Sequence, residues 1–250
     1  QLDPTHVLYY RYKNGEITER ILEYIREADL CTVTHERLAD EVYKHNKNVT
    51  ILPNALPYGE EQFLDNKIES DLVRLFWSGS GTHEPDIKIL KNPMRKISQL
   101  SGIKSVIAGY NDGEQQIWNK MCMWFSNEYK IPTQIYRFTE TFKYMAAYAD
   151  SDISLIPLVE STFNSMKSNL KVLETAAKKN PVIVSNVHPY KDLPVLYVNK
   201  QTDWFKHTRD LVLDKSMREE LGLKLHEYCV QNYSLKHINK QRFDIYSKLL

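Results

Sequence analysis

The chain has 250 residues, and its 33 lysines and arginines nearly balance 32 aspartates and glutamates, so the formal net charge is +1 at pH 7. This balance excludes a nucleic-acid binder that relies on bulk positive charge, while the length and 42% hydrophobic content suit one large or two small globular domains. No apolar run approaches the roughly 20 residues of a membrane-spanning helix. Together with three scattered cysteines that form no zinc or disulfide pattern, this predicts a cytoplasmic protein, with peripheral membrane association left open.

The N-terminal part predicts a helix followed by one β-α-β unit. Apolar residues with helical or strand-like spacing place helix, strand, helix and strand in turn at residues 16–28, 30–34, 35–45 and 49–52. Pro53 and Pro57 end this section, because proline interrupts regular structure. The polar, acidic residues 58–70 that follow predict a linker.

The second part alternates apolar strands with amphipathic helices. Six strands are predicted, at residues 73–77, 105–108, 133–138, 153–159, 182–185 and 195–198. Helices are predicted from about residue 86 with a break near Pro93, then at 113–125, 142–149 and 168–179, with a loop at 160–167 and mostly helix after residue 201. Continuously apolar strands between helices indicate an α/β fold with a doubly wound parallel sheet, a Rossmann-like domain over residues 71–231.

Ligands of such sheets bind at the carboxyl ends of the strands, so the candidate site residues lie in the loops that follow strands. The first of these loops holds Gly79, Ser80, Gly81, Thr82 and His83. Glycines let backbone N–H groups approach a phosphate, and the start of the next helix favours an anion. The loop matches neither the dinucleotide fingerprint nor the P-loop, so a plain turn, with His83 as a helix cap, is the alternative.

A second loop leads into the predicted helix 168–179 and contributes Lys167, Ser168, Asn169, Lys171 and Glu174. Ser168 or Asn169 suits a helix N-cap, and the two lysines and Glu174 share one helical face. Free N–H groups and two ammonium groups near a helix start favour a diphosphate, and Glu174 suits a ribose diol as acceptor. The alternative is a solvated Lys171–Glu174 ion pair of little energetic weight.

A third loop offers Arg137 and Phe138, which with Tyr136 could form a wall for a flat base, or simply pack at the strand end. Asp150 and Asp152 flank the start of a strand, which is the wrong end of the sheet for catalysis, so they are interpreted as helix-end and turn residues. The sequence shows neither a Ser-His-Asp arrangement nor a metal-ligand cluster, so no catalytic residue and no metal are assigned.

The order of these segments resembles the C-terminal, donor-binding portion of GT-B glycosyltransferases, and most of all glycosyltransferase family 4. Ala28-Asp29 and Pro53-Asn54, which flank the first β-α-β unit, look like the family's exit from its N-terminal domain. The run from Gly79 to Asp86 looks like a Gly-Ser-x-Thr-His-x-x-Asp loop. The segments 148–157 and 167–185 are similar to its aspartate-strand-proline element and its donor-binding helix.

The resemblance implies that Glu174 binds the ribose, that the start of the Ser168/Asn169 helix binds the diphosphate with Lys167 or Lys171, and that the loop after Phe138 holds the base. It also implies that residues 79–83 face the diphosphate or the sugar. Two positions depart from the family pattern. Met166 stands where an acidic residue is frequent, and His83 stands near where many members carry a basic one.

The same resemblance implies a two-domain organisation. Residues 1–57 correspond to the tail of an acceptor-side Rossmann domain whose remainder is missing, and residues 232–250 correspond to a helix that crosses back to it. We therefore expect a hexosyltransferase-type glycosyltransferase of the retaining and metal-independent kind, which uses a nucleoside-diphosphate sugar as substrate and no cofactor. Its acceptor would be a glycan, a lipid-linked molecule, a protein or a modified base, and this fragment alone is expected to be inactive. The alternatives are a non-catalytic nucleotide-sugar-binding module and a sugar-nucleotide epimerase.

Overall fold

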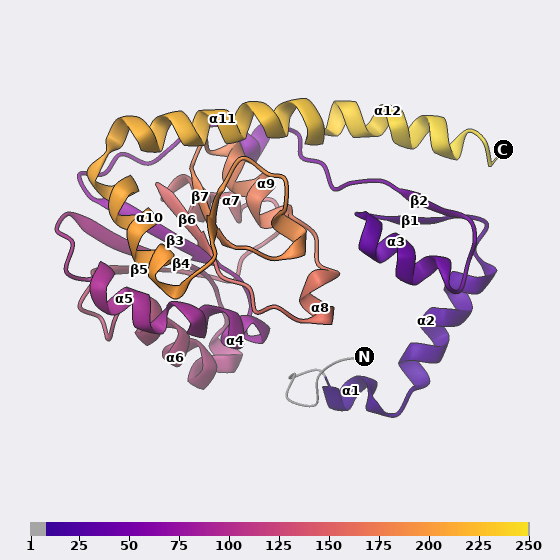
Figure 1. Ribbon diagram of the computed structural model, residues 1–250, viewed down its shortest axis with the longest axis horizontal. Helices are drawn as coiled ribbons and strands as arrows, with labels where there is room; N and C mark the ends of the chain where they lie inside the picture. The colour runs from indigo at the N-terminus through magenta and orange to yellow at the C-terminus, as the bar shows by residue number, and fades with distance from the viewer. Residues whose placement is uncertain (1–8, 250) are drawn as a thin grey trace.

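The computed structural model describes residues 9–249, which form an α/β domain, a small N-terminal unit beside it and two long C-terminal helices (Figure 1). In the view of Figure 1 the α/β domain lies on the left and the N-terminal unit on the right. The helices α11 (Lys215–Tyr233) and α12 (Leu235–Tyr246) run along the top from the domain toward the unit.

The central sheet has six parallel strands in the spatial order β5-β4-β3-β6-β7-β8, as the sequence predicts. Their bounds are β3 Val73–Ser78, β4 Ile103–Tyr110, β5 Thr133–Arg137, β6 Ile153–Ile156, β7 Val182–Ser185 and β8 Leu196–Val198. The chain builds outward from β3 in one direction and from β6 in the other. The carboxyl ends of β3 and β6 therefore mark the switch point where doubly wound sheets bind ligands.

Alternating side chains of the strands separate two cores, one on each face of the sheet. Phe76 belongs to one core, whereas its neighbours Leu75 and Trp77 belong to the other. One face is covered by α4 (Glu84–Ile87), α5 (Lys91–Ile97), α6 (Gln115–Phe125) and α10 (Gln201–Leu213). The other is covered by α7 (Met145–Ala149), α9 (Leu170–Ala177) and α11.

A buried ion network closes the amino end of the sheet. The Arg74 guanidinium donates hydrogen bonds to the Asp152 carboxylate at 2.8 and 3.1 Å, to Asp150 Oδ1 at 2.9 Å and to the Ile68 carbonyl at 2.7 Å. The Tyr136 hydroxyl donates to the other Asp150 oxygen at 3.0 Å. Asp150 caps the end of α7 and Asp152 follows in a bend, so both occupy the helix-end and turn positions expected from the sequence.

The acidic segment expected to be a linker packs along the α/β domain. The buried Lys178 ammonium donates to the Gln62 carbonyl at 3.0 Å, to the Leu64 carbonyl at 2.5 Å and to Asn66 Oδ1 at 2.8 Å. Phe63 lies in the core, in a 3₁₀ turn at Glu61–Phe63. Three carbonyl-type oxygens around one ammonium therefore hold this segment against α9.

The N-terminal unit is a two-stranded parallel sheet with helices. Its elements are α1 Tyr9–Lys13, α2 Glu16–Glu27, β1 Cys31–Val33, α3 Glu36–Tyr43 and β2 Val49–Ile51. Among the described residues, neither α2 nor α3 contains a fully buried side chain, although both helices are amphipathic. The chain leaves the unit at Leu56, whose N–H and carbonyl pair with Tyr233 and Leu235 at 3.0 and 2.9 Å. The assignment of this unit to the tail of a first domain stays a prediction.

Three local elements differ from the sequence prediction. The helix that follows β3 is interrupted by a 3₁₀ turn at Lys88–Leu90 and not at Pro93. Pro93 lies in the first turn of α5, where a backbone N–H has no partner within the helix, so proline is tolerated there. The predicted loop 160–167 contains the short helix α8 (Thr162–Ser165). The helix expected from residue 142 begins only at Met145, so Phe142 is exposed. Further 3₁₀ turns span Gly81–His83, Asp112–Glu114 and His188–Tyr190.

Candidate functional site

A pocket of about 580 Å³ opens at the switch point of the sheet. It lies between the carboxyl ends of β3, β4 and β5 on one side and helices α7 and α9 on the other. Five residues predicted for the site line it, namely Gly79, Arg137, Phe138, Lys171 and Glu174. The other predicted residues lie outside this lining, and they are Ser80, Gly81, Thr82, His83, Lys167, Ser168 and Asn169.

Two glycines let the loops after β3 and β4 meet at the pocket. A Cβ on Gly79 would lie 2.7 Å from the buried Trp77 ring, and a Cβ on Gly109 would lie 2.0 Å from the Gly79 carbonyl oxygen. Gly109 also has φ +103°, a conformation that other residues rarely adopt. Gly109 was not predicted as a site residue, because a single glycine at the end of an apolar strand belongs to no sequence motif.

Lys171 brings an enclosed positive charge to the pocket. Its ammonium lies 5.5 Å from the centroid of the Trp77 ring, and no carboxylate among the described residues comes within 4.0 Å of it. Burial and the neighbouring Lys167 ammonium lower the pKa of Lys171 from 10.5 to about 8, although Asp86 and Glu174 oppose the shift. The ammonium is therefore a partly desolvated cation that an anion could stabilise.

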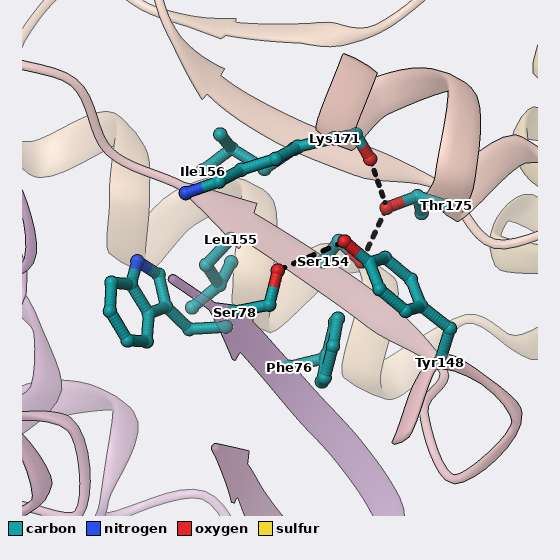
Figure 2. A pocket seen from close by; sticks show the side chains of 9 residues that line it. Phe76, Ser78, Tyr148, Ser154, Leu155, Ile156, Lys171 and Thr175 are labelled. Carbon is teal, nitrogen blue, oxygen red and sulfur yellow. Dashed lines mark hydrogen bonds between the residues drawn. The ribbon is translucent and has the colours of Figure 1, made fainter. Parts of the chain in front are cut away.

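Figure 2 shows the small cavity beneath the Lys171 side chain. Its volume is about 10 Å³, close to the space of one water molecule. Ser78 and Tyr148 hydroxyls meet at 2.9 Å on one side, and Thr175 meets Ser154 at 3.0 Å on the other (Figure 2). The Thr175 hydroxyl is placed to donate either to Ser154 Oγ or to the Lys171 carbonyl, which lies 2.8 Å away. The cavity therefore combines these hydroxyls with apolar walls from Phe76, Trp77, Leu155 and Ile156 below the cation.

Glu174 lies on α9 one turn beyond Lys171 and is only 8% exposed. Its two oxygens accept hydrogen bonds from the hydroxyls of Tyr144 at 2.9 Å and Tyr148 at 2.5 Å. Burial raises the pKa of Glu174, although the two tyrosines and Lys171 counteract this. A carboxylate has about four acceptor positions, so this one can still accept hydrogen bonds from a ligand diol. The i, i+4 spacing of the two tyrosines places them on one side of α7, but only the packing of α7 on α9 brings them to Glu174.

His83 forms a second polar cluster next to the pocket. Its Nδ1 lies 2.7 Å from Asp86, which also accepts from the Val159 N–H at 2.8 Å and lies 3.9 Å from the Lys167 ammonium. Burial and the Lys171 charge lower the pKa of His83 to about 4, so the imidazole is neutral at pH 7. Burial opposes ionisation of Asp86, but the hydrogen bonds from His83 and Val159 prevail and lower its pKa. The i, i+3 spacing of His83 and Asp86 was the available sequence signal.

The remaining predicted residues have other contacts. Ser80 and Thr82 hydroxyls bond each other at 2.7 Å, and Gly81 is buried against the Glu114 side chain. Asn169 precedes α9 without a side-chain cap, and Ser168 accepts a hydrogen bond from Asn54 at 2.8 Å. At the open end of the pocket, Arg137 pairs with Asp112 at 3.0 Å, and Phe138 is 81% exposed.

Comparison with solved structures places this architecture among known folds. Sucrose-phosphate synthase from Thermosynechococcus elongatus superposes with a TM-score of 0.69 at 14% identity, covering 98% of this chain and 65% of that one. S. aureus TarM, in a complex that contains UDP, superposes with a TM-score of 0.69 at 14% identity. This match covers 92% of this chain and 46% of TarM. Anabaena HepE, in complex with UDP and glucose, superposes with a TM-score of 0.71 at 10% identity. This match covers 97% of this chain and 70% of HepE.

The fold is that of the GT-B glycosyltransferases. This chain spans about two thirds or less of the first two neighbours, so it corresponds to a part of a complete GT-B protein. No protein-family model matches the sequence, and no curated protein is found as a relative. Identities of 10 to 14% establish the GT-B architecture alone, and the chemistry must be argued from the pocket.

Within residues 9–249, no group of three or more His, Cys, Asp or Glu side chains is arranged to hold a metal ion. None of the described helices is both long enough and apolar enough to cross a bilayer.

Proposed function

We propose that this chain is the donor-binding part of a glycosyltransferase of the family 4 kind, which transfers a hexosyl group from a nucleoside-diphosphate sugar with retention and without a metal ion. One observation carries the proposal. Lys171 and Glu174, one turn apart on α9, present an ammonium without a carboxylate partner and a carboxylate with only hydroxyl partners to the same pocket. These are complementary to the diphosphate and the ribose of one nucleotide.

The pocket suggests an orientation for such a donor. The ribose hydroxyls would donate to Glu174, and the base would extend toward the exposed Phe138 at the open end. The diphosphate would then lie over Lys171 and the glycine-containing turn after β3. UDP is the first nucleotide to test, because the TarM and HepE neighbours were solved with it.

In this proposal, the Lys171 ammonium stabilises the negative charge of the departing diphosphate. As the bond between the sugar carbon and the diphosphate oxygen breaks, negative charge grows on the leaving diphosphate. An enclosed ammonium stabilises that charge better than a solvated one, because less water screens it. With a pKa of about 8, Lys171 is protonated in about nine-tenths of the molecules at pH 7. The acceptor side would come from the remainder of a GT-B protein, and we expect little transfer by this chain alone.

Titration calorimetry with UDP- and GDP-sugars tests the proposal. We expect Glu174→Gln to weaken donor binding by about 1–3 kcal/mol, because a charged acceptor of the ribose hydroxyls is lost while the side-chain shape is kept. The control is Glu220→Gln on α11, which removes an exposed carboxylate and should leave the affinity unchanged. Equal affinities of all three proteins, with unchanged melting temperatures, would exclude Glu174 from the donor site.

A further inference from the structure

Positive charge is segregated along the chain in the crossovers around β4. From Ile87 to Asn111 the sequence contains five cations (Lys88, Lys91, Arg95, Lys96 and Lys104) and no acidic residue. From Gln115 to Asn127 it contains one cation, Lys120, and again no acidic residue. In a chain with nearly equal numbers of both charges, this separation concentrates positive potential on the side of the domain built by α5 and α6.

These cations are unpaired. We call the set of Lys88, Lys91, Arg95, Lys96, Lys120 and Lys130 the basic face, and all six residues are exposed. Among the residues that the structure describes, none of the six lies within 4.0 Å of a carboxylate oxygen, whereas Lys104 pairs with Asp150 at 3.8 Å. The fold therefore leaves the full charge of this face available to an outside partner.

An aromatic side chain lies within the basic face. The ammonium groups of Lys88 and Lys91 lie 6.0 and 5.9 Å from the centroid of the Trp124 ring on α6. Met123 and Tyr129 nearby are exposed apolar side chains. Tryptophan, flanking lysines and exposed apolar groups together are typical of surfaces that rest at the headgroup level of a bilayer.

A shallow hollow of about 430 Å³ adjoins this aromatic group. Arg95 and Lys130 line it together with the polar side chains of Ser98, Gln99 and Asn127, and Glu128 is its single acidic residue. Asn127 donates to Ser98 Oγ at 2.7 Å, which fixes part of the lining. Two cations beside hydroxyl and amide groups suit a phosphate ester.

We propose that the basic face is a docking surface for an anionic lipid bilayer. A bilayer is favoured over a nucleic acid because the charges are spread over the outer sides of two helices around an amphipathic aromatic ring, with exposed apolar side chains beside them. None of its residues lines the candidate donor pocket. In Figure 1, α5 and α6 lie on the lower side of the domain, opposite α11 and α12.

Sedimentation of the 250-residue chain with lipid vesicles tests this proposal. We expect binding to vesicles of phosphatidylcholine mixed with phosphatidylserine, little binding to phosphatidylcholine alone, and loss of binding at high salt. The double substitution Lys88→Glu/Lys91→Glu should reduce the binding by about tenfold or more, and Trp124→Ala should reduce it less. The matched control, Lys224→Glu/Lys236→Glu on α11 and α12, changes the net charge equally and should retain most of it.

Four outcomes would overturn the proposal. They are equal binding to both kinds of vesicle, no binding to either, an equal loss in the control pair, and binding of an anionic oligonucleotide without binding of vesicles. Circular dichroism and melting temperatures establish that each variant is folded. UDP-sugar affinity provides a separate readout, and the substitutions on the basic face should leave it unchanged.

Discussion

The two ends of the central sheet both contain buried charge, but they treat it in opposite ways. At the amino end, Arg74 is 3% exposed, and its guanidinium donates hydrogen bonds to oxygens of Asp150, Asp152 and Ile68. At the carboxyl end, Lys171 has no carboxylate within reach among the described residues, and Glu174 is bonded only to neutral hydroxyls. One end satisfies its charges by hydrogen-bonded ion pairs, and the other leaves Lys171 and Glu174 without an ionic partner within 4.0 Å among the described residues.

The two ends therefore differ in whether their charged side chains are paired within the protein. A buried charge that is fully paired adds rigidity and has no capacity left for a ligand. A partly desolvated charge without a partner reduces the stability of the free protein and gains most from a complementary ligand. Substitutions at the two ends should therefore change stability in opposite directions.

The largest expected effect is at the amino end. Arg74→Met should lower the free energy of unfolding by about 3–5 kcal/mol, because the buried Asp150 and the partly buried Asp152 lose their main hydrogen-bonded counter-ion. Urea unfolding measures the change. The control is Arg137→Met, whose exposed pair with Asp112 should contribute less than about 1 kcal/mol. Similar losses in both variants would show that the Arg74 network is no more stabilising than a surface pair.

At the carboxyl end, Lys171→Met should raise the free energy of unfolding by about 1–3 kcal/mol, because it removes an unpaired buried cation. The same change should weaken UDP-sugar binding at least tenfold. The folded pKa of about 8 lies below the ordinary 10.5, so the unfolded chain binds more protons between these values. The advantage of the variant is therefore complete below pH 8 and fades as the pH rises toward 10.5. Destabilisation at pH 7 would contradict this account of Lys171.

A smaller effect is expected from pH on donor affinity. If the protonated Lys171 binds the diphosphate, UDP-sugar affinity should fall about fourfold between pH 6.5 and 8.5, as the protonated fraction falls. Titration calorimetry across this range gives the profile. The Lys171→Met protein should bind weakly with a flat profile, and an equally steep profile in that variant would assign the titration to another group.

The smallest effect concerns His83. Its pKa of about 4 keeps the ring neutral, so UDP-sugar affinity should change less than about twofold between pH 5.5 and 6.5. Calorimetry at the two pH values is sufficient. A clear rise in affinity on acidification would show that His83 gains a proton in the complex, as a substitute for the basic residue common in the family.

The sequence predicted the sheet because its inner strands β3, β4, β6 and β7 are short, mainly apolar runs, which favour burial on both faces. The same logic located the pocket, since loops after parallel strands must share one edge. Lys171 and Glu174 could be assigned to one face from their spacing along a single helix, which is a local property.

The contacts that complete the pocket depend on segments distant in sequence. Tyr144 and Tyr148 have the composition of core residues, and only the packing of α7 against α9 brings their hydroxyls to Glu174. Gly109 must lack a side chain because β4 lies beside β3, which brings the Gly79 carbonyl oxygen against it. Asp86 likewise meets the Val159 N–H across 73 positions of the chain.

The crossing of two chain segments at Leu56 has a mechanical consequence. The polypeptide passes between the N-terminal unit and the α/β domain twice. The two passages are joined at Leu56, whose N–H donates to the Tyr233 carbonyl and whose carbonyl accepts from the Leu235 N–H. Beyond Leu56, the Lys178 ammonium holds residues 62–66 against the domain through three hydrogen bonds. The unit also contacts the domain at His35, whose Nε2 lies 3.1 Å from the Met166 carbonyl oxygen. The crossing of residues 53–57 with residues 233–235 and the His35 contact thus hold the unit to the domain at two separate places.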